Sequence, residues 1–281
     1  MTIDAAETLL FLHIPKAAGT TLSRVAERHT PAARQYRLGG NAQAAIEHFN
    51  RLPEAQRARY RLISGHFPYG VHQRVPGPCA YFTVLRDPVD RVASFYYFVR
   101  EEPRHYLNEH MTPAQAASLG EFARTTSCPI VDNGQTRQLA GDWGRIPFGQ
   151  CDRALLETAK RNLESVAVVG LTNRFRATLM LLGQRFDWPH LGYRKANETQ
   201  ARPATEVLDG TTRSALESLN ALDQELYAFA QDLFEARWAA SGLDDSHFTE
   251  RHPPPTMAQD LCWRLKSRTP AEWCRKLAGR K

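Results

Sequence analysis

The sequence predicts an α/β fold of three layers, with helices on both sides of a central, mostly parallel sheet. Short apolar runs alternate with amphipathic helical patterns, the chain order typical of parallel sheets. The first apolar run leads through a glycine-containing turn directly into a helix. With 281 residues, 42% of them hydrophobic and 23% charged, the chain is large enough to bury one full core. We therefore expect one main domain over residues 1–250 and a proline-containing basic appendage over residues 251–281.

Strands are predicted where short runs of apolar, β-branched or aromatic residues end at Pro, Gly or Asp. In chain order, these runs are residues 8–14, 61–64, 80–85 and 166–170. The run 80–85 is the clearest of them, because β-branched and aromatic residues fill most of it. Asp87 and Pro88 end this run, and Pro88 suits the first position of the helix that follows.

Helices are predicted where apolar residues recur at a spacing of three or four. In chain order, these segments are residues 20–29, 41–49, 54–60, 88–100, 152–164, 172–186 and a long one through 219–233. The two segments between 41 and 60 are short and polar. Residues 101–150 are rich in polar residues, glycine and proline, so they predict short helices at most.

The formal net charge of +6 suits an anionic partner, such as a nucleotide, a nucleic acid, a membrane surface or an acidic glycan. Much of the excess positive charge lies in residues 263–281, so the rest of the chain is closer to neutral.

The five cysteines form no C-x-x-C pair, and no two histidines have the H-x-x-x-H spacing of a helical metal site. The sequence therefore predicts reduced, structural thiols and no bound metal. No apolar run approaches the roughly 20 residues that span a bilayer, and no signal-peptide core is evident near the start. We expect a cytoplasmic protein.

The first candidate site is the turn HIPKAAGTT at residues 13–21, between the first strand and the first helix. Small residues let the backbone approach a phosphate, and the N–H groups at a helix start favour an anion. Lys16 adds a positive charge, and Thr20 and Thr21 add hydroxyl donors. The lysine precedes the glycine, so this is not a Walker A loop. An ordinary strand–helix turn with a solvated lysine is the alternative interpretation.

The second candidate site is the segment RDPVDRVAS, which begins at Arg86. Arg86 follows a strand, so its guanidinium is expected at the carboxyl edge of the sheet, where ligands bind in open α/β folds. The planar guanidinium suits a phosphate, and Ser94, two turns into the next helix, is a further donor. The alternative is an ion pair at the helix start, either Arg86 with Asp90 or Asp87 with Arg91.

Two anion sites at neighbouring strand ends suit a ligand with phosphates at both ends. Together, these segments resemble sulfotransferases that use PAPS (3′-phosphoadenosine 5′-phosphosulfate). HIPKAAGTTL is similar to their 5′-phosphosulfate loop, and RDPVDRVAS is similar to their 3′-phosphate element. With SGH at residues 64–66, the pattern looks most like the branch of heparan sulfate and uronyl 2-O-sulfotransferases and their bacterial relatives. The resemblance implies a P-loop-like fold.

Further segments extend the resemblance from about residue 9 to about residue 238. These segments are NGQTRQLAG at 133–141, GLTNRF at 170–175 and a D-x-x-L-Y element at 223–227.

The resemblance also implies roles for individual residues. Lys16, Ala17, Ala18, Gly19, Thr20 and Thr21 would hold the 5′-phosphosulfate, and Arg86 and Ser94 would hold the 3′-phosphate. Arg194 and Lys195 match a late basic pair that closes over the nucleotide. Asn133 and Arg137 lie where the family meets its acceptor.

His66 matches the catalytic histidine of this branch, and histidine accepts a proton near neutral pH. The implied reaction is an in-line transfer. The acceptor hydroxyl gives its proton to His66 while it attacks sulfur, and Lys16 stabilises the leaving phosphate oxygen of the product PAP (adenosine 3′,5′-bisphosphate). His13 is the rival base, but its position before Pro15 favours a role in bracing the loop.

Two other function classes stay open at this point. One is a P-loop-type kinase or other nucleotide-binding enzyme, and the missing Walker lysine argues against it. The other is a non-catalytic protein that binds an anionic glycan. We expect the acceptor to be a glycan or glycoconjugate and expect no nucleic-acid partner. Residues 263–281 are either a solvated appendage or one with a weak contact to a membrane surface. The oligomeric state and the sulfated position stay open.

Overall fold

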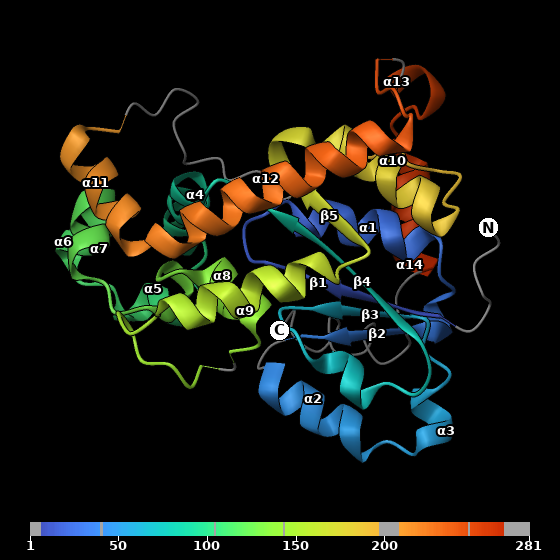
Figure 1. Cartoon of the computed structure of the whole chain (residues 1–281), viewed down its shortest axis with the longest axis horizontal. Helices are drawn as coiled ribbons and strands as arrows, with labels where there is room; N and C mark the ends of the chain where they lie inside the picture. Colours follow the sequence, from blue (N-terminus) through green and yellow to red (C-terminus); the bar gives the residue numbers. More distant parts are fainter. Residues whose placement is uncertain are drawn as a thin grey trace.

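A computed structural model describes residues 7–39, 42–103, 105–142, 144–196, 208–246 and 248–266. The strands in these ranges form one parallel sheet with the order β2-β3-β1-β4-β5 (Figure 1). They are β1 (Thr8–Leu12), β2 (Gln35–Leu38), β3 (Leu62–Gly65), β4 (Cys79–Leu85) and β5 (Val168–Leu171). The predicted α/β fold with a parallel sheet is confirmed.

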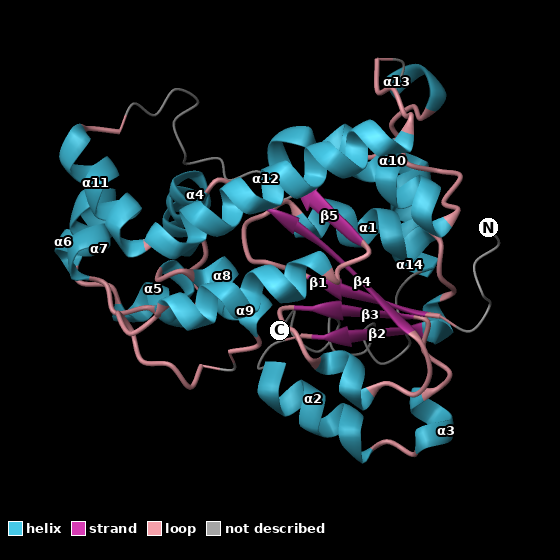
Figure 2. Cartoon of the chain, in the orientation of Figure 1, coloured by secondary structure: helices cyan, strands magenta, loops and turns pink. Residues whose placement is uncertain are grey.

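Helices surround this sheet and extend well beyond one side of it (Figure 2). In the first half of the chain they are α1 (Gly19–Arg28), α2 (Ala42–Arg51), α3 (Glu54–Arg57), α4 (Pro88–Glu101), α5 (Tyr106–His110), α6 (Pro113–Ala117), α7 (Leu119–Thr125) and α8 (Gly134–Ala140). In the second half they are α9 (Arg153–Glu164), α10 (Phe175–Phe186), α11 (Gly210–Leu219), α12 (Ala221–Ser241), α13 (Phe248–Arg251) and α14 (Met257–Lys266). Short 3-10 turns lie at Ala32–Arg34, Val71–Arg74, Pro129–Val131 and Thr172–Arg174.

The central strands are apolar on both faces because helices or neighbouring segments cover both faces. Every residue of β1 and of β5 is buried. Phe11 of β1 and Phe82 of β4 are paired in register, and their rings stack with centroids 4.8 Å apart. Helix α1 contacts β3, whereas α10 and α12 contact β5. The alternation of strand and helix in the sequence therefore corresponds to the main core, which surrounds the sheet.

A second, smaller core lies beside the sheet, on the left-hand side of Figure 1. It joins one face of α4 to α7 and α11 through buried apolar side chains. Val92 and Phe95 of α4, Phe122 of α7 and Leu216 of α11 are among its members. This core holds α4, the helix that follows Arg86, against α7 and α11.

The predicted strands and helices are present, with ends shifted by a few residues, whereas β2, α11, α13 and α14 were not predicted. Strand β2 reads Gln-Tyr-Arg-Leu and lies at the sheet edge, where only its last residue is buried. A short polar edge strand has no apolar pattern of its own, because its position depends on pairing with β3.

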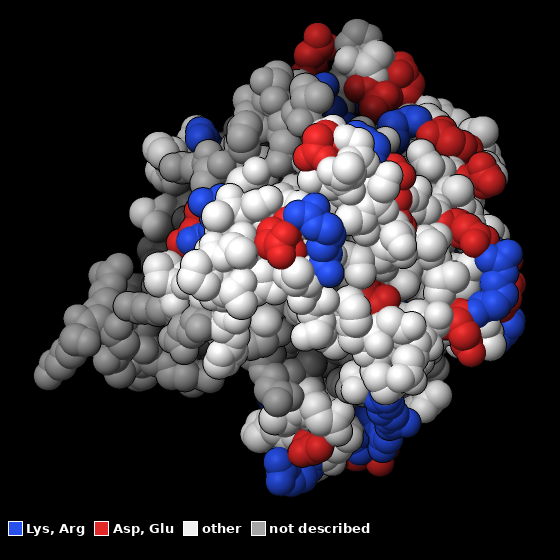
Figure 3. Space-filling model, turned by 90° about the vertical axis from the view of Figure 1, so that its left-hand side faces the viewer, with Lys and Arg blue, Asp and Glu red and all other residues white. Residues whose placement is uncertain are grey.

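The positive net charge does not gather into one patch on the face shown in Figure 3. On the described part of that face, Lys and Arg side chains lie among Asp and Glu side chains. Within the described ranges, no helix is long and apolar enough to cross a membrane.

Gly170 allows α10 to pack closely against β5. A β-carbon added there would lie 2.2 Å from Cγ2 of Thr178 and 3.1 Å from a methyl group of Val84. The Thr178 hydroxyl meanwhile accepts a hydrogen bond of 3.1 Å from the backbone N–H of Leu171. Helix and strand are therefore held at a distance that only glycine permits.

We predict that Gly170→Ala lowers the free energy of unfolding by about 1–3 kcal/mol, the usual effect of overpacking a core. Urea denaturation followed by circular dichroism measures it. Adding Thr178→Ser removes Cγ2 but keeps the hydroxyl, so the double variant should regain part of the loss. An equal or larger loss in the double variant would contradict this explanation.

Candidate active site

The carboxyl ends of β3, β1 and β4 bring three predicted site segments together. Leu12 of β1 pairs with Gly65 of β3 and with Thr83 of β4, so neighbouring strands end at nearly the same level. The backbone N–H of His13 donates to the Gly65 carbonyl over 3.0 Å, which continues the β1–β3 pairing into the loops. Residues 13–21, His66 and Arg86 therefore leave the sheet at the same edge. The sequence analysis expected the two loops at neighbouring strand ends.

The loop at residues 13–21 has the backbone of an anion-binding turn. Lys16 and Ala18 adopt left-handed conformations, with φ of 65° and 59°. Such conformations cost a non-glycine residue about 1–2 kcal/mol, and strained residues of this kind cluster at ligand sites. Ala18 caps α1 without any side-chain hydrogen bond, and the start of a helix favours an anion.

Gly19 is required because the His13 ring lies directly over it. A β-carbon at this position would come within 1.9 Å of the ring atom Cδ2 of His13. The His13 ring also stacks on Phe11, with centroids 5.3 Å apart. Burial, His66 and Lys16 hold the pKa of His13 well below its usual value, so the ring is neutral. His13 thus braces the loop, as predicted.

Lys16 lies against an aromatic ring of α4. Its Nζ atom is 4.1 Å from the centroid of the Phe98 ring, a cation–π contact. Burial lowers the pKa of Lys16 to about 8, with a further contribution from the nearby Arg86. The ammonium group is therefore poorly stabilised in the free protein and favours a bound anion.

Arg86 connects the two predicted anion sites. One guanidinium nitrogen donates to the Lys16 carbonyl over 3.0 Å, while Nε and Nη2 contact Oδ2 of Asp90 at 2.7 Å and 2.6 Å. The Arg86–Asp90 pair, an alternative interpretation of the sequence, is thus formed in the ligand-free chain. Asp87 instead caps α4 by accepting from the N–H of Asp90, so it does not pair with Arg91.

Ser94 lies on the same helix, α4, and its side chain is buried. Its position two turns after Arg86 is the one that the sequence analysis expected for a phosphate donor.

His66 has a defined tautomer. Its Nδ1 atom lies 2.8 Å from the backbone oxygen of His13, and a carbonyl oxygen only accepts hydrogen bonds. Nδ1 must therefore carry the proton, which leaves a lone pair on Nε2. Part of the ring is exposed to solvent, yet desolvation by the surrounding protein lowers the pKa of His66. A neutral imidazole with a free Nε2 is the form that a general base requires.

Gln138 of α8 holds the His13 carbonyl that orients His66. Its amide nitrogen donates to the His13 oxygen over 3.1 Å and to the Phe67 oxygen over 3.0 Å. These two carbonyls belong to the segments that follow β1 and β3. Gln138 therefore connects the segment that carries His66 to the His13 carbonyl.

A cavity of about 330 Å³ opens beside His66 on the β2 side of the sheet. Its lining residues are His13, Thr20, Ser23, Arg24, Glu27, Arg37, Leu38, Gly39, Ser64, Gly65 and His66. Thr20, Ser23, Arg24 and Glu27 repeat at helical spacing and so form one face of α1. Arg37 of β2 pairs with Glu27 over 2.7 Å. Since Arg86 lies on the β4 side, His66 stands between the cavity and the predicted 3′-phosphate residue.

The sequence analysis did not identify the cavity residues of α1 and β2. The polar face of α1, continuing from Thr20 by three and four residues, is the signal that could have found Ser23, Arg24 and Glu27. Arg37 had no such signal, because strand β2 was not predicted.

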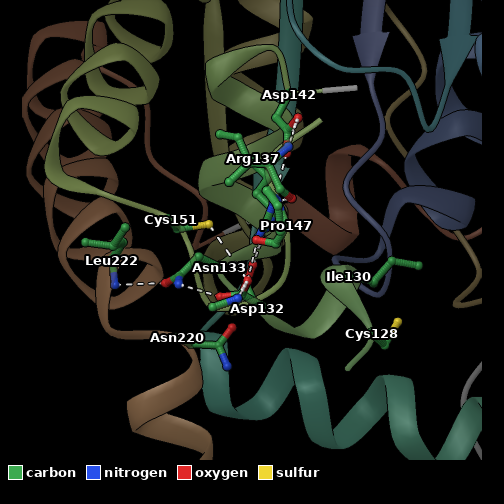
Figure 4. Close-up of polar contacts among 12 residues, drawn as sticks. Cys128, Ile130, Asp132, Asn133, Arg137, Asp142, Pro147, Cys151, Asn220 and Leu222 are labelled. Atoms are coloured by element: carbon green, nitrogen blue, oxygen red, sulfur yellow. Dashed lines mark hydrogen bonds and ion pairs between the residues drawn. The ribbon is translucent and has the colours of Figure 1, made fainter. Parts of the chain in front are cut away.

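The structure places Asn133 in a buried joint between α8 and α12 (Figure 4). Its Oδ1 atom accepts from the N–H groups of Leu222 and Asp223 over 2.9 Å and 3.1 Å, at the start of α12. In return, the Asp223 carboxylate accepts from the N–H groups of Gln135 and Thr136 over 3.1 Å and 2.7 Å, at the start of α8. The two helices thus cap each other.

Arg137 is also engaged within the protein (Figure 4). Its guanidinium pairs with the carboxylates of Asp132 and Asp142, and it donates to the carbonyls of Asp132, Ile146 and Pro147. Only 5% of the residue is exposed. The structure therefore does not bring Asn133 or Arg137 to the cavity beside His66, and their predicted contact with the acceptor stays a prediction.

The predicted late basic pair lies on a segment that returns to the first loop. The N–H of Ala196 donates to Oγ1 of Thr21 over 3.1 Å, and Arg194 donates to the Pro255 carbonyl over 2.7 Å. Within the described ranges, no three His, Cys, Asp or Glu side chains form a metal-binding group.

Comparisons with known proteins also find sulfotransferases, the class that the two loops resemble. A family model described as the sulfotransferase family matches residues 1–136. Heparan-sulfate 6-O-sulfotransferase 1 of Homo sapiens is 33% identical over 192 residues, which cover 59% of this chain and 46% of that protein. Heparan-sulfate 6-O-sulfotransferase 2 of Gallus gallus is 25% identical over 284 residues, which cover 84% of this chain and 69% of that protein.

A solved structure, mouse sulfotransferase SULT7A1 complexed with PAP, aligns over 94% of this chain and 89% of that chain. It is 16% identical, and the TM-score is 0.38.

Residues 1–136 of the chain are therefore similar to the sulfotransferase family, as the two loops predicted. These relatives are 6-O-sulfotransferases, whereas the motifs looked most like the 2-O branch. The chain spans about half the length of several curated relatives, namely 46%, 47% and 44% of three of them.

We predict that Asn133→Gly lowers the free energy of unfolding by about 1–3 kcal/mol, because the N–H groups of Leu222 and Asp223 lose their acceptor. Glycine keeps the left-handed backbone that Asn133 adopts, with φ of 50°, so the loss reports the missing side chain with its Oδ1 atom. Thermal unfolding measures the change. Unchanged stability would show that this oxygen does not hold α12.

Proposed function

We propose that this chain transfers a sulfuryl group from PAPS to a hydroxyl of a carbohydrate acceptor, with His66 as the general base. The observation that carries the proposal is the placement of His66. His66 lines an open cavity beside the first candidate anion loop, and the His13 carbonyl sets its tautomer, which leaves a lone pair on Nε2. The similarity of residues 1–136 to the sulfotransferase family supports the same donor and the same reaction class.

The donor would lie across the ends of β1 and β4. The 5′-phosphosulfate suits the start of α1, where the helix end favours an anion and where Lys16, Thr20 and Thr21 would contribute an ammonium group and two hydroxyls. The 3′-phosphate suits Arg86 and Ser94 on the far side. The Arg86 side chain would exchange part of its contact with Asp90 for the phosphate, which accepts from the same nitrogen atoms.

The transfer itself is a single in-line displacement. The acceptor oxygen attacks sulfur as its proton passes to Nε2 of His66, and the bond between sulfur and the bridging phosphate oxygen breaks. The electron pair of that bond stays on PAP, where Lys16 and the loop N–H groups stabilise the new charge. The imidazolium that forms at His66 keeps its Nδ1 hydrogen bond to the His13 carbonyl, which favours the charged form.

The cavity beside His66 is the place for the acceptor. Arg24 and Arg37 outnumber Glu27, the partner of Arg37, so the cavity lining has a net positive charge, while the Ser23 hydroxyl suits a sugar hydroxyl. The relatives are named for heparan sulfate, an anionic glycan, and an acidic sugar unit suits a cavity with two arginines. We therefore propose a glycan with carboxylate or sulfate groups as the acceptor class.

We predict that His66→Ala lowers kcat by about 10²–10⁴-fold, the usual contribution of a general base, and leaves the Kd for PAP nearly unchanged. Labelled PAPS offered with acidic glycans, neutral glycans, glycolipids and phenols measures transfer, and calorimetry measures PAP binding. His110→Ala is the matched control, since His110 lies on the separate helix α5. Near wild-type transfer by the His66 variant would remove the base assignment. Absence of PAP binding by the wild type would overturn the proposed function.

We predict that PAP binding weakens as the pH rises above about 8. The pKa of Lys16 is about 8 in the free protein, and a phosphate beside its ammonium group raises that pKa in the complex. Below pH 8 the lysine is already charged, so this group leaves affinity unchanged there. Above pH 8, binding must also take up a proton, and affinity falls by up to about tenfold per pH unit.

Calorimetry from pH 6.5 to pH 9.5 in buffers of different ionisation enthalpy would detect this proton uptake. Lys16→Met should bind PAP more weakly at neutral pH and should lack the inflection near pH 8. Lys160→Met, a change on α9, should keep it. If Lys16→Met showed the same inflection near pH 8, another titrating group would be its cause.

A further inference from the structure

Residues 190–196 run along α1 from its last turn to its first. At one end, Nε2 of His29 lies 3.1 Å from the His190 carbonyl. At the other end, the N–H of Ala196 donates to Oγ1 of Thr21 over 3.1 Å. We call residues 190–196 the crossing segment. It carries Arg194 and Lys195 and ends at the loop proposed to hold the phosphosulfate.

The C-terminal residues 252–263 hold this crossing segment from the other side. Arg194 donates through Nε to the Pro255 carbonyl over 2.7 Å. A β-carbon on Gly192 would lie 2.0 Å from the Pro253 carbonyl oxygen, so the two backbones are in direct contact. Helix α14 lies beside α1 in Figure 1, and a side-chain contact between the two confirms this.

Arg28, in the last turn of α1, joins all three elements. Its Nη1 donates to the Gly192 carbonyl over 2.6 Å, and its Nη2 pairs with the Asp260 carboxylate over 3.2 Å. The guanidinium also lies 4.2 Å from the centroid of the Trp263 ring. The side chains of Arg28 and Asp260 are only 6% and 12% exposed. A nearly buried ion pair holds together the two helices that carry its charges, because leaving either charge unpaired is costly.

We propose that Arg28 and Asp260 are positioning residues for the donor site. They lock residues 252–263 against α1, and this lock holds the crossing segment at Thr21 before the nucleotide arrives. The inference rests on the proposed PAPS site. It makes residues 252–263 part of that site, although the sequence suggested a separate appendage from residue 251 onward.

The expected consequence is an effect on donor binding alone. If the crossing segment is already ordered, the nucleotide binds without the entropic cost of ordering it. Loss of the lock transfers that cost to the binding step. Once the donor is bound, the segment is in place and the chemistry at His66 proceeds as before.

The test uses Asp260→Asn in the full-length chain, since asparagine keeps the shape of the side chain and removes its charge. We expect the Kd for PAP and the KM for PAPS to rise by about tenfold, with kcat at saturating PAPS unchanged. Hydrogen exchange should accelerate in peptides that cover residues 190–196, and bound PAP should restore their protection. Trp263→Ala, which removes the ring under Arg28, should change the same quantities in the same direction.

Arg237→Gln is the matched control for simple loss of stability. Arg237 donates to the carbonyls of Val166 and Glu164, so its removal should lower the melting temperature without changing the Kd for PAP. An unchanged Kd in Asp260→Asn would overturn the inference, whether or not exchange accelerates. If wild-type protein fails to bind PAP, the proposed function falls instead, and the exchange comparison still decides whether Asp260 holds the segment.

Discussion

The candidate active site depends most on the interactions of one buried group, the carboxylate of Asp223. Asp223 and Arg91 have no exposed side-chain surface, and their charged atoms lie 3.5 Å apart. The carboxylate also accepts from the backbone of Gln135 and from both the backbone and the hydroxyl of Thr136. A buried charge with several donors is stable, whereas the same charge with a donor removed is costly. The start of α8 is therefore fixed in one position and one orientation.

Helix α8 transmits this constraint to both sides of the candidate active site. Gln135 makes a pair of hydrogen bonds with the backbone N–H and carbonyl of Arg86, at 3.0 Å and 2.9 Å. One turn later, Gln138 bonds the His13 carbonyl that sets the tautomer of His66. A single short helix thus fixes both the residue proposed for the 3′-phosphate and the group that orients the proposed base. The polar residues of α8 thus hold these two parts of the candidate site through contacts within the protein.

The sequence predicted the two loops and His66 because each lies within a contiguous strand–turn segment. A strand end, a small-residue turn and a helix start are local features, and parallel strands bring such features to one edge. The structural role of Asn133, by contrast, could not be predicted from a local segment. Asn133 looks like an exposed polar residue, but its partner Asp223 is 90 positions away, and only the packing of α12 buries the pair. The sequence did not reveal the cavity either. Arg37, one of its lining residues, lies on an edge strand that has no apolar pattern of its own.

The ion pair of Arg86 with Asp90, one of the two interpretations of the sequence, is confirmed, and the anion site at Arg86 stays a prediction. In the ligand-free chain, closely spaced cations need internal partners: Asp90 serves Arg86, Glu27 serves Arg37, and the Phe98 ring serves Lys16. In the proposed complex a phosphate would replace these partners with a stronger one, so affinity would depend on the difference between the two sets of contacts. Burial, with a contribution from Arg86, lowers the pKa of Lys16 to about 8. A bound phosphate would therefore favour the Lys16 ammonium, which the proposed mechanism sets beside the leaving phosphate oxygen.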